Sequence, residues 1–288
     1  MAALWFARRA DVTVVSADSR QLYRGFDVGT AKPTREERAA LPHVGIDVLD
    51  PMTRSSAAWW AEQADAWVRD IEAEQRVPLV VGGTGLYLRS LFGTLFEEPE
   101  LDGARRAAMQ EVLDDVSTDE LRRWVRELDP PRSHLGRAQL LRAAEIALLA
   151  GERLSDLHRR NARAPRRKAR YLVVDPGETL GARIADRTRA MLAGGWEDEV
   201  RGLMASVPED APAWNASGYR TVRDAVRGRV TSREAEARIV TETRQYAKRQ
   251  RTWFRHQLAN DDVTRLSTDQ SDWAARATAW WTEGESGG

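Results

Sequence analysis

Short runs of aliphatic and β-branched residues alternate along the chain with longer amphipathic stretches of helical period. The pattern predicts four buried strands, at 12–15, 46–49, 78–81 and 171–174. It predicts helices within the stretches 57–73, 180–204 and 232–256. Short apolar strands that alternate with helices are typical of a parallel sheet covered on both faces. We therefore expect an α/β fold, with a parallel sheet flanked by helices.

One segment interrupts this alternation. Between 102 and 170 the sequence shows only helical pattern, broken at Asp129-Pro-Pro131 and at Gly151. We predict that 102–170 forms an all-helical lobe, inserted into an α/β core made of 1–101 and 171–288.

Both ends of the sequence carry signals of their own. The stretch 267–281 predicts one further helix, and 283–288 is expected to be frayed. The chain opens in an apparent helix at 2–9, with no strand or capping residue before it. Because an α/β sheet normally begins with a strand, this pattern indicates a sequence that starts inside a domain.

The composition excludes several classes of function. The chain has no cysteine, which excludes disulfides, thiolate catalysis and zinc–thiolate sites. None of its four histidines has metal-ligand spacing, and no apolar run approaches the ~18 residues of a membrane span. At the start of the chain an apolar stretch precedes the positive charges, the reverse of a signal peptide. These features predict a cytoplasmic protein without a membrane segment.

Arginine dominates the basic residues, although the formal net charge is zero. Lys32, Lys168 and Lys248 are the only lysines among 44 basic residues. A GC-rich genome accounts for the overall bias, so the clusters carry more information than the total. The segment 159–170 holds seven positive charges in twelve residues without an acid. It predicts a phosphate-contacting surface, or alternatively a solvated linker that closes the helical lobe.

Two loops follow predicted strands, at the edge where open α/β sheets bind ligands. The first contains Ser16-Ala-Asp-Ser19, in which Asp18 is a candidate general base or metal ligand. The second contains Gly82-Gly-Thr-Gly85, whose backbone N–H groups and following helix suit an anion. The alternatives are an Asp18 that only caps its turn, and glycines that only allow a tight turn.

A third motif lies on the predicted helix 232–256. Bases and aromatic residues are interleaved from Thr243 to Arg255, in the order Thr-Arg-Gln-Tyr-Ala-Lys-Arg-Gln-Arg-Thr-Trp-Phe-Arg. This composition suits stacking and phosphate contact with RNA. A helix that buries its aromatic residues in the core and exposes its arginines would look similar, and both interpretations can hold together.

Taken in order, these motifs resemble the tRNA dimethylallyltransferase family over about 4–256. The resemblance rests on Ser-Ala-Asp-Ser, then Gly-Thr-Ala-Lys-Pro at 29–33, then Gly-Gly-Thr, and then the 243–255 helix. Further matches are Arg142-Ala-Ala-Glu145, 180–191 and Ser217-Gly-Tyr-Arg220. The resemblance implies a fold related to P-loop NTPases, with a helical insertion that binds the tRNA anticodon stem-loop.

The resemblance also implies a reaction and its residues. The N6 amine of adenosine 37 attacks dimethylallyl diphosphate and displaces diphosphate, with Mg²⁺ assisting, in an enzyme that is usually monomeric. Asp18 matches the family's general base, Thr84 a catalytic position near the extruded base, and Arg187 its diphosphate-binding arginine, with Gly82 and Gly83 as further diphosphate contacts. The implied tRNA contacts are Asp18, Ser19, Arg20, Gln21, Thr84, Arg106, Arg142, Thr243, Arg244, Gln245 and Lys248.

The sequence departs from the family pattern in two places. The family begins with a strand and a Gly-Pro-Thr-x-Ser-Gly-Lys-[Ser/Thr] loop about twenty residues before the position of Asp18, and no such loop occurs in this sequence. Without this loop the chain lacks the family's diphosphate-binding backbone and its usual Mg²⁺ ligand. It also lacks a central strand, so the neighbouring strands would keep unpaired edges. In the lobe, Gly136 and Gln139 replace an acid and an arginine of the family's Asn-Asp-x-x-Arg.

These departures leave alternatives open. The missing loop indicates either a start codon placed too far downstream, which we favour, or a genuine truncation. The chain as printed is expected to bind diphosphate poorly and to catalyse little or nothing. The main alternative is a catalytically inactive RNA-binding remnant of the same family. A small-molecule kinase of the P-loop class suits the α/β core but leaves the 18–21 loop, the helical lobe and the 243–255 helix unexplained.

Overall fold

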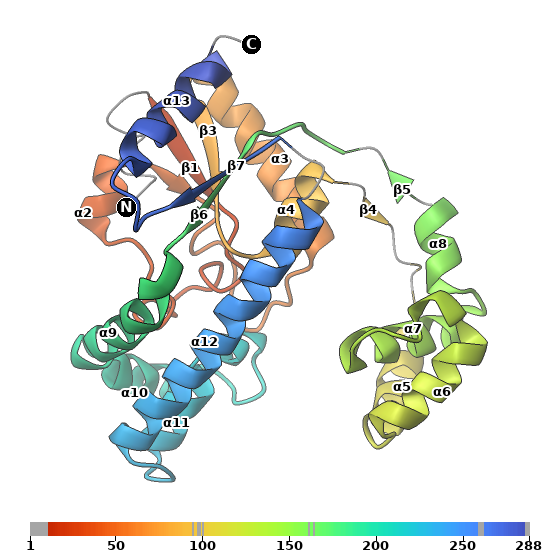
Figure 1. Cartoon of the computed structure of the whole chain (residues 1–288). Helices are drawn as coiled ribbons and strands as arrows, with labels where there is room; N and C mark the ends of the chain where they lie inside the picture. Colours follow the sequence, from red (N-terminus) through yellow and green to blue (C-terminus); the bar gives the residue numbers. More distant parts are fainter. Residues whose placement is uncertain are drawn as a thin grey trace. The chain divides into compact units, whose positions relative to one another are not determined.

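The computed structural model describes residues 11–93, 95–96, 99, 101–160, 162–163, 165–258 and 262–285. The chain divides into two compact units (Figure 1). Gly93–Pro165 forms one, termed here the insertion unit, and Met1–Phe92 with Arg166–Gly288 forms the other, termed the core unit. The predicted helical lobe, 102–170, falls largely on the insertion unit. The predicted helix at 2–9 lies outside the described residues.

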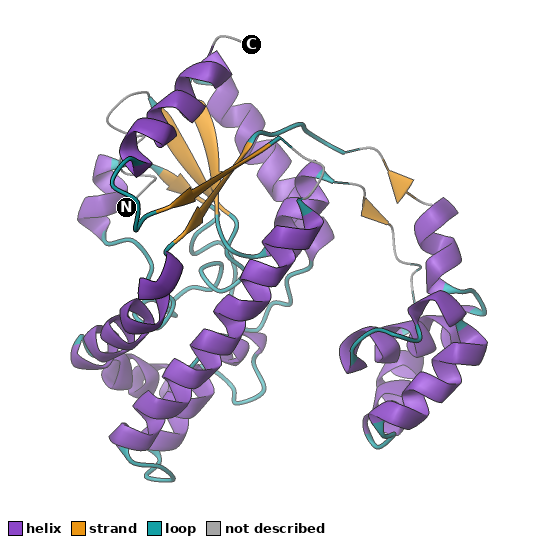
Figure 2. Cartoon of the chain, in the orientation of Figure 1, coloured by secondary structure: helices purple, strands orange, loops and turns teal. Residues whose placement is uncertain are grey.

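The core unit has an α/β architecture, with its strands at the centre and helices around them (Figure 2). Its elements are β1 (Val12–Ser16), α2 (Arg35–Ala40), β2 (His43–Val44), α3 (Ala57–Ala73), β3 (Val77–Val81), α4 (Gly85–Phe92), β6 (Tyr171–Asp175), α9 (Leu180–Ala193), α10 (Trp196–Ser206), α11 (Tyr219–Val226), α12 (Ser232–Gln257), β7 (Val263–Ser267) and α13 (Trp273–Glu285), with 3-10 turns at Gly177–Thr179 and Pro212–Asn215.

The central sheet is parallel and has the order β2-β1-β3. Val12 lies opposite Val77 and Ser16 opposite Val81, so β1 and β3 end at the same edge of the sheet. All five residues of β1 are buried. Burial on both faces explains why this strand has no alternation of apolar and polar positions in the sequence.

Helix α3 covers this sheet and matches the predicted bounds 57–73 at both ends. It begins after Ser56, whose side chain accepts the N–H of Trp59 and so caps the helix. The side chains that it buries recur every three or four positions, as expected for one helix face: Trp60, Ala61, Ala64, Val68 and Ile71.

Strands β6 and β7 form a second parallel pair, with Tyr171 opposite Val263. Among the described residues, β3 pairs only with β1, and β6 pairs only with β7. Each strand therefore has one edge without a strand partner. A cavity of about 1050 Å³ is lined by residues of both strands, 77–81 and 171–174.

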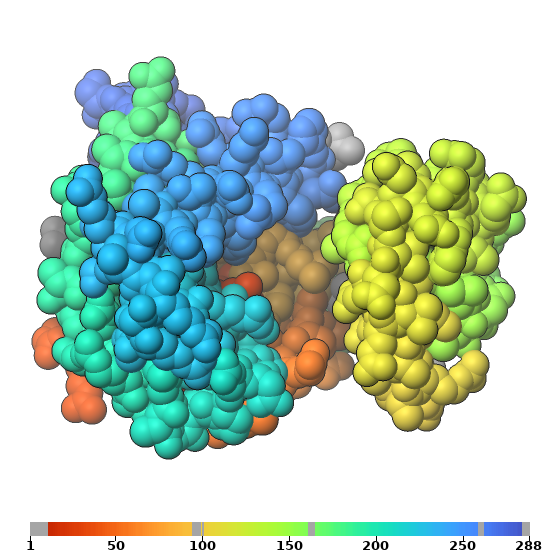
Figure 3. All heavy atoms as spheres, turned by 90° about the horizontal axis from the view of Figure 1, so that it is seen from below, coloured from red at the N-terminus to blue at the C-terminus, as the bar shows by residue number. Residues whose placement is uncertain are grey.

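Helices α9, α10 and α11 pack together with α12 in the core unit. Helix α12 begins at a reciprocal capping box between Thr231 and Glu234. It packs against α9 and α11. In the space-filling view of Figure 3, α12 (blue) lies directly on this helical segment (teal) and keeps one long face exposed.

The insertion unit is mainly helical. Its elements are β4 (Leu95–Phe96), α5 (Gly103–Asp114), α6 (Thr118–Leu128), a 3-10 turn at Pro130–Arg132, α7 (Arg137–Ala150), α8 (Leu154–Arg160) and β5 (Ala162–Arg163). The helices enclose a core of their own: Leu113, Leu121, Val125, Leu140, Ala143, Ala144, Ile146, Leu154 and Leu157. Gly151, a predicted break, ends α7 in the left-handed conformation (φ 69°).

Several predicted boundaries are wrong. The strand predicted at 46–49 is absent: β2 lies earlier, and Asp47 adopts a positive φ of 59°, so this segment turns. The stretch 180–204 contains two helices, α9 and α10, with a turn at Gly195 (φ 92°) between them, and α10 continues to Ser206. Strand β7 ends at Ser267 and turns cover 268–272, so the last helix begins only at Trp273. The lobe segment, expected to lack strands, contains the short strand β5.

Candidate active site

The loops that follow β1 and β3 are hydrogen-bonded to each other. The Ala17 N–H donates to the Val81 carbonyl (2.8 Å), and the Thr84 N–H donates to the Ala17 carbonyl (3.2 Å). The Ser19 N–H donates to the Thr84 hydroxyl (3.1 Å). The structure thus brings together the predicted site residues Asp18, Ser19 and Thr84, at the carboxyl edge of the sheet.

The two glycines of the second loop allow close packing of the chain. A Cβ on Gly82 would lie 2.2 Å from the Ala17 carbonyl oxygen, and a Cβ on Gly83 would lie 2.1 Å from Nε2 of Gln250. That same Nε2 donates to the Gly83 carbonyl (2.8 Å). Neither glycine has a positive φ, so close packing rather than turn dihedrals explains the absence of a side chain here. Their role in diphosphate binding stays a prediction.

Asp18 is half-buried and forms a local turn. Its Oδ1 accepts the Arg20 N–H at 2.8 Å, a contact that fixes the carboxylate relative to its own loop. The same residue lines a cavity of about 980 Å³ in the core unit. This residue therefore both caps its turn and lines the cavity, and its role as a base stays a prediction.

Three of the predicted site residues line this cavity: Asp18, Arg187 and Thr243. Arg187 comes from the exposed side of α9, where Arg183 lies one helical turn earlier and also lines the cavity. Arg183 donates to the Thr268 hydroxyl (3.4 Å). The cavity thus combines two guanidinium groups with the carboxylate of Asp18, and the carboxylates of Asp186 and Asp269 also line it. A carboxylate beside guanidinium groups suits a proton transfer coupled to departure of an anion.

Helix α12 contributes a polar donor to the cavity and keeps its basic side chains outside. Burial raises the pKa of Tyr246, and the negative charge of Asp18 raises it further, so the phenol stays protonated at neutral pH. Arg244, Gln245 and Lys248 are exposed, and Arg244 donates to the Gly181 carbonyl (3.3 Å). Their RNA contacts stay predictions.

The aromatic residues near the end of α12 pack against the protein. A Cβ on Gly85 would lie only 2.4 Å from the ring of Trp253, so this ring packs directly against the glycine. The same ring meets Phe254 edge-on, with 5.1 Å between ring centres. Trp253 and Phe254 thus pack against the protein but stay half-buried, and Arg244, Arg249 and Arg255 of the same helix are exposed.

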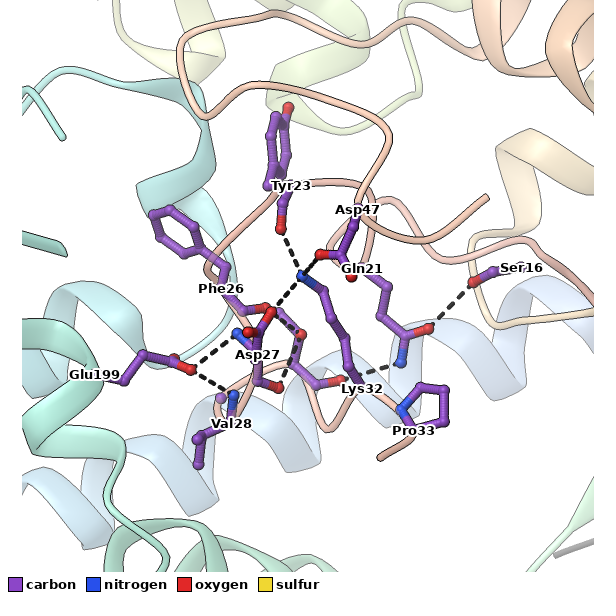
Figure 4. Close-up of polar contacts among 12 residues, drawn as sticks. Ser16, Gln21, Tyr23, Phe26, Asp27, Val28, Lys32, Pro33, Asp47 and Glu199 are labelled. Carbon is purple, nitrogen blue, oxygen red and sulfur yellow. Dashed lines mark hydrogen bonds and ion pairs between the residues drawn. The ribbon is translucent and has the colours of Figure 1, made fainter. Parts of the chain in front are cut away.

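Gln21 braces the loop that carries Asp18 (Figure 4). Its Oε1 accepts the Ser16 hydroxyl (3.2 Å), and its Nε2 donates to the carbonyls of Thr30 (3.2 Å) and Ala31 (3.3 Å). The amide is thus held by its own loop. Its predicted contact with a bound base stays a prediction.

A second anchor of this loop was not found from the sequence. Oε2 of Glu199 accepts the N–H groups of Asp27 (2.9 Å) and Val28 (2.7 Å) (Figure 4). Oε1 of Glu199 accepts the hydroxyl of Tyr219 (2.6 Å), which lies in the 217–220 motif. Glu199 gives no signal in the sequence, because an acid in the first turn of a helix is common.

In the insertion unit, the predicted residues Arg106 and Arg142 meet at one buried carboxylate. Arg106 Nε donates to Oε1 of Glu145 (2.7 Å), and Arg142 pairs with Oε2. Gln110 also donates to Oε1 (3.1 Å). Burial alone would raise the pKa of Glu145, but the hydrogen bonds and charges of the two arginines outweigh it and hold the pKa below its usual range.

This cluster predicts a pH-dependent contribution to stability. Because the pKa of Glu145 is lowered on folding, its contribution is complete above the unfolded value of about 4.3 and is lost as pH falls through the lowered value. We expect Glu145→Gln to lower the melting temperature of the insertion unit by about 4–8 °C at neutral pH, the change that ~1 kcal/mol gives in a domain of this size. The difference from the unsubstituted chain should shrink in acid.

Circular dichroism melts across pH measure this effect, and hydrogen exchange of peptides from α5 and α7 localises it. Glu111→Gln, on the exposed surface of α5, is the matched control. A melting difference that persists unchanged in strong acid would show that the ionised carboxylate is not the cause.

The basic segment 159–170 is largely neutralised within the protein. Five of its arginines form ion pairs: Arg159 with Asp156, Arg160 with Glu152, Arg166 with Glu62, Arg167 with Asp65 and Glu72, and Arg170 with Asp262 and Glu283. These pairs favour the linker interpretation, since they anchor the segment by its own side chains.

Comparison with known proteins identifies the family of the chain. A profile of the IPP transferase family matches residues 21–257. A tRNA dimethylallyltransferase of Anaeromyxobacter sp. (strain K) is 42% identical over 259 residues, covering 88% of this chain and 85% of the relative. That of Thermosynechococcus vestitus is 38% identical over 261 residues, covering 88% and 81%.

Solved structures of tRNA isopentenylpyrophosphate transferases resemble this chain as well. The tRNA delta(2)-isopentenylpyrophosphate transferase of Staphylococcus epidermidis has a TM-score of 0.67 at 26% identity, covering 99% of this chain and 94% of its own. The full-length Bacillus halodurans tRNA isopentenylpyrophosphate transferase has a TM-score of 0.68 at 29% identity, covering 98% and 91%. These relatives place the chain among the prenyltransferases. It belongs to the IPP transferase family, so the predicted family and fold class are confirmed.

Proposed function

We propose that this chain transfers the dimethylallyl group of dimethylallyl diphosphate to N6 of adenosine 37 in the anticodon stem-loop of tRNA. The observation that carries the proposal is the cavity lined jointly by Asp18, Arg187 and Thr243, in a member of the IPP transferase family. The names of the curated relatives, tRNA dimethylallyltransferases, support the choice of both substrates.

The reaction replaces a carbon–oxygen bond by a carbon–nitrogen bond and transfers one proton. The N6 nitrogen bonds to the first carbon of the dimethylallyl group, the bond from that carbon to the diphosphate oxygen breaks, and the N6 proton passes to Asp18. An exocyclic amine is a weak nucleophile, so a carboxylate placed to take its proton lowers the barrier. Arg187, with Arg183 beside it, stabilises the charge that gathers on the leaving diphosphate.

We assign contacts with the nucleic acid within each unit separately. The base must leave the stack to reach a cavity in the protein, and we assign it to Asp18, Ser19, Arg20, Gln21 and Thr84. Further tRNA contacts are assigned to Arg106 and Arg142 in the insertion unit, and to Thr243, Arg244, Gln245 and Lys248 on α12. The exposed basic side chains of α12, Arg244 and Lys248, support this assignment.

Mg²⁺ enters the proposal as a partner of the diphosphate. Among the residues that the structure describes, no group of three or more histidine, aspartate or glutamate side chains is placed to hold a metal. Mg²⁺ in such enzymes is commonly held by one or two carboxylates together with substrate phosphates. The described residues thus form no such cluster of their own, and the two steps above are assigned to Asp18 and Arg187 alone.

The open strand edges support a further part of the proposal, namely that full catalysis needs one more strand and its Gly-x-x-x-x-Gly-Lys-[Ser/Thr] loop. β3 and β6 each have an edge without a strand partner in the described chain, and both line the 1050 Å³ cavity. Val77, Val81 and Val174 there are each about 40% exposed. A parallel strand between these edges would cover them and place its loop beside Asp18.

The test compares the printed chain with a version extended by such a strand and loop. Each is incubated with labelled dimethylallyl diphosphate, an anticodon stem-loop and Mg²⁺, and transferred label is counted. We expect transfer by the extended version and little or none by the printed chain. Turnover by the printed chain at the rate of the extended one would refute the need for the loop. Binding of the stem-loop by both without transfer by either would favour the RNA-binding remnant.

We place this reaction in the cytoplasm, on a monomeric protein. Within the described part of the chain, no helix has the length and apolar character to cross a bilayer.

A further inference from the structure

Lys32 occupies an unusual position for a lysine in this chain. Arginine fills nearly every basic position in the sequence, and Lys32 is one of three exceptions. Lys168 and Lys248 are exposed, whereas only 2% of the Lys32 side chain is accessible. A buried lysine in so arginine-rich a chain indicates a site that an arginine would not fit.

The surroundings of Lys32 explain this preference (Figure 4). Its Nζ donates to the Tyr23 carbonyl (2.6 Å), to Oδ1 of Asp27 (2.6 Å) and to Oδ1 of Asp47 (2.5 Å). An ammonium group has three N–H donors around one atom, and here three acceptors converge on it. A guanidinium is planar and spreads its five donors over three nitrogens, so it cannot meet acceptors that converge on one point.

A second contact fixes the carboxylate of Asp47 that accepts from Lys32. Arg38 donates to its other oxygen, Oδ2, at 2.9 Å. The backbone of Asp47 adopts a positive φ of 59°, which costs energy for a residue other than glycine. The conformation turns the chain where the sequence alone suggested a strand. The cost is offset by the two cations that this turn lets the carboxylate reach.

The ammonium group is linked to the active-site loop by a short series of contacts. Lys32 directly follows Thr30 and Ala31, whose carbonyls accept the Gln21 amide. Gln21 in turn holds the Ser16 hydroxyl at the end of β1, so Asp18 lies between two fixed points. Fixing Lys32 therefore fixes the two carbonyls, the Gln21 amide and the loop that carries the proposed base.

We infer that Lys32 is a positioning residue for the extruded base: its three hydrogen bonds hold the 16–21 loop in the shape that receives adenosine 37. The inference rests on the proposed function, because the loop is assigned there to the base. Lys32 is too buried to touch RNA itself, and it acts through Thr30, Ala31 and Gln21.

The experiment uses the printed chain and a stem-loop with 2-aminopurine at position 37, whose fluorescence rises when the base leaves the stack. Lys32→Arg keeps the charge but not the three convergent bonds, and Lys32→Met removes both. Loss of a charge-assisted hydrogen bond should lower the extruded population by about tenfold at saturating protein, with a much smaller change in stem-loop affinity. Arg227→Lys, a basic exchange at the surface ion pair with Glu209, is the control.

A purely structural role would lower the melting temperature of the Lys32 variants but leave the fluorescence of the folded complex unchanged, and that result would overturn the inference. If Lys32→Arg does not fold, Asp47→Asn, which removes the charge of one partner and keeps its shape, must show the same loss. No fluorescence rise with the unsubstituted chain would overturn the proposed function and this inference with it. A rise that is unaltered in Lys32→Arg overturns the inference alone.

Discussion

Replacing Asp18 by asparagine should lower the rate of dimethylallyl transfer by about 10²–10⁴-fold, the contribution typical of a general base. The measurement is single-turnover transfer of label by the extended version of the chain. Asparagine has the shape of aspartate, and its Oδ1 can still accept the Arg20 N–H that closes the turn. Stem-loop binding should therefore change little, and the loss should appear in the rate at saturating substrate.

Asp50→Asn is the matched control for this prediction. Oδ1 of Asp50 accepts the Met52 N–H at 2.9 Å, in the same relation that Asp18 has to Arg20, but Asp50 does not line the 980 Å³ cavity. Its substitution tests the cost of altering such a turn without removing the proposed base. An Asp18→Asn variant as fast as Asp50→Asn would exclude Asp18 as the proton acceptor.

Trp60→Ala should lower the free energy of unfolding by about 3–5 kcal/mol, the range for deleting a fully buried tryptophan. The side chain of Trp60 is fully buried and stacks on Tyr87, with 4.7 Å between ring centres. Its indole N–H donates to the Ser16 carbonyl (3.1 Å), at the end of the strand that leads to Asp18. Truncation leaves a cavity and an unsatisfied buried carbonyl together.

Urea unfolding measures this effect, with an unchanged slope as the sign that only stability has altered. Trp60→Phe keeps most of the ring but removes the N–H, and it should lower the free energy of unfolding by a smaller amount than Trp60→Ala. Trp59→Ala, at the adjacent half-buried position, is the control. If Trp60→Ala were no less stable than Trp59→Ala, the packing of α3 on the active-site strand would be wrongly described.

The fold could be predicted where one physical effect dominates a segment. β1, β3 and β6 are apolar runs, and α3 and α12 have clear helical period with capping residues, so the predicted elements agree with the structure. β7 was missed because Val263-Thr-Arg-Leu-Ser267 has only two apolar residues and becomes a strand by pairing with β6. The strand expected at 46–49 was wrong because the ion pairs of Asp47 decide its backbone, and they come from distant residues.

The candidate site was predictable in part. The order of the motifs indicated Asp18, Arg187 and Thr243, and the structure brings these residues to one cavity. The sequence marks Lys32 as one of few lysines in an arginine-rich chain, but it does not reveal that the side chain is buried. Glu199 depends on a tertiary contact across 171 residues, which no local pattern reveals.

The position at which the prenyl group is attached tests the proposed function most directly. The most direct measurement digests the stem-loop after reaction with the extended chain and identifies the modified nucleoside by mass spectrometry, beside a stem-loop that carries guanosine at position 37. The account predicts one dimethylallyl group, on N6 of adenosine 37, and none on the guanosine stem-loop. A bound stem-loop that stays unmodified, or a group attached at any other nucleoside, would contradict it.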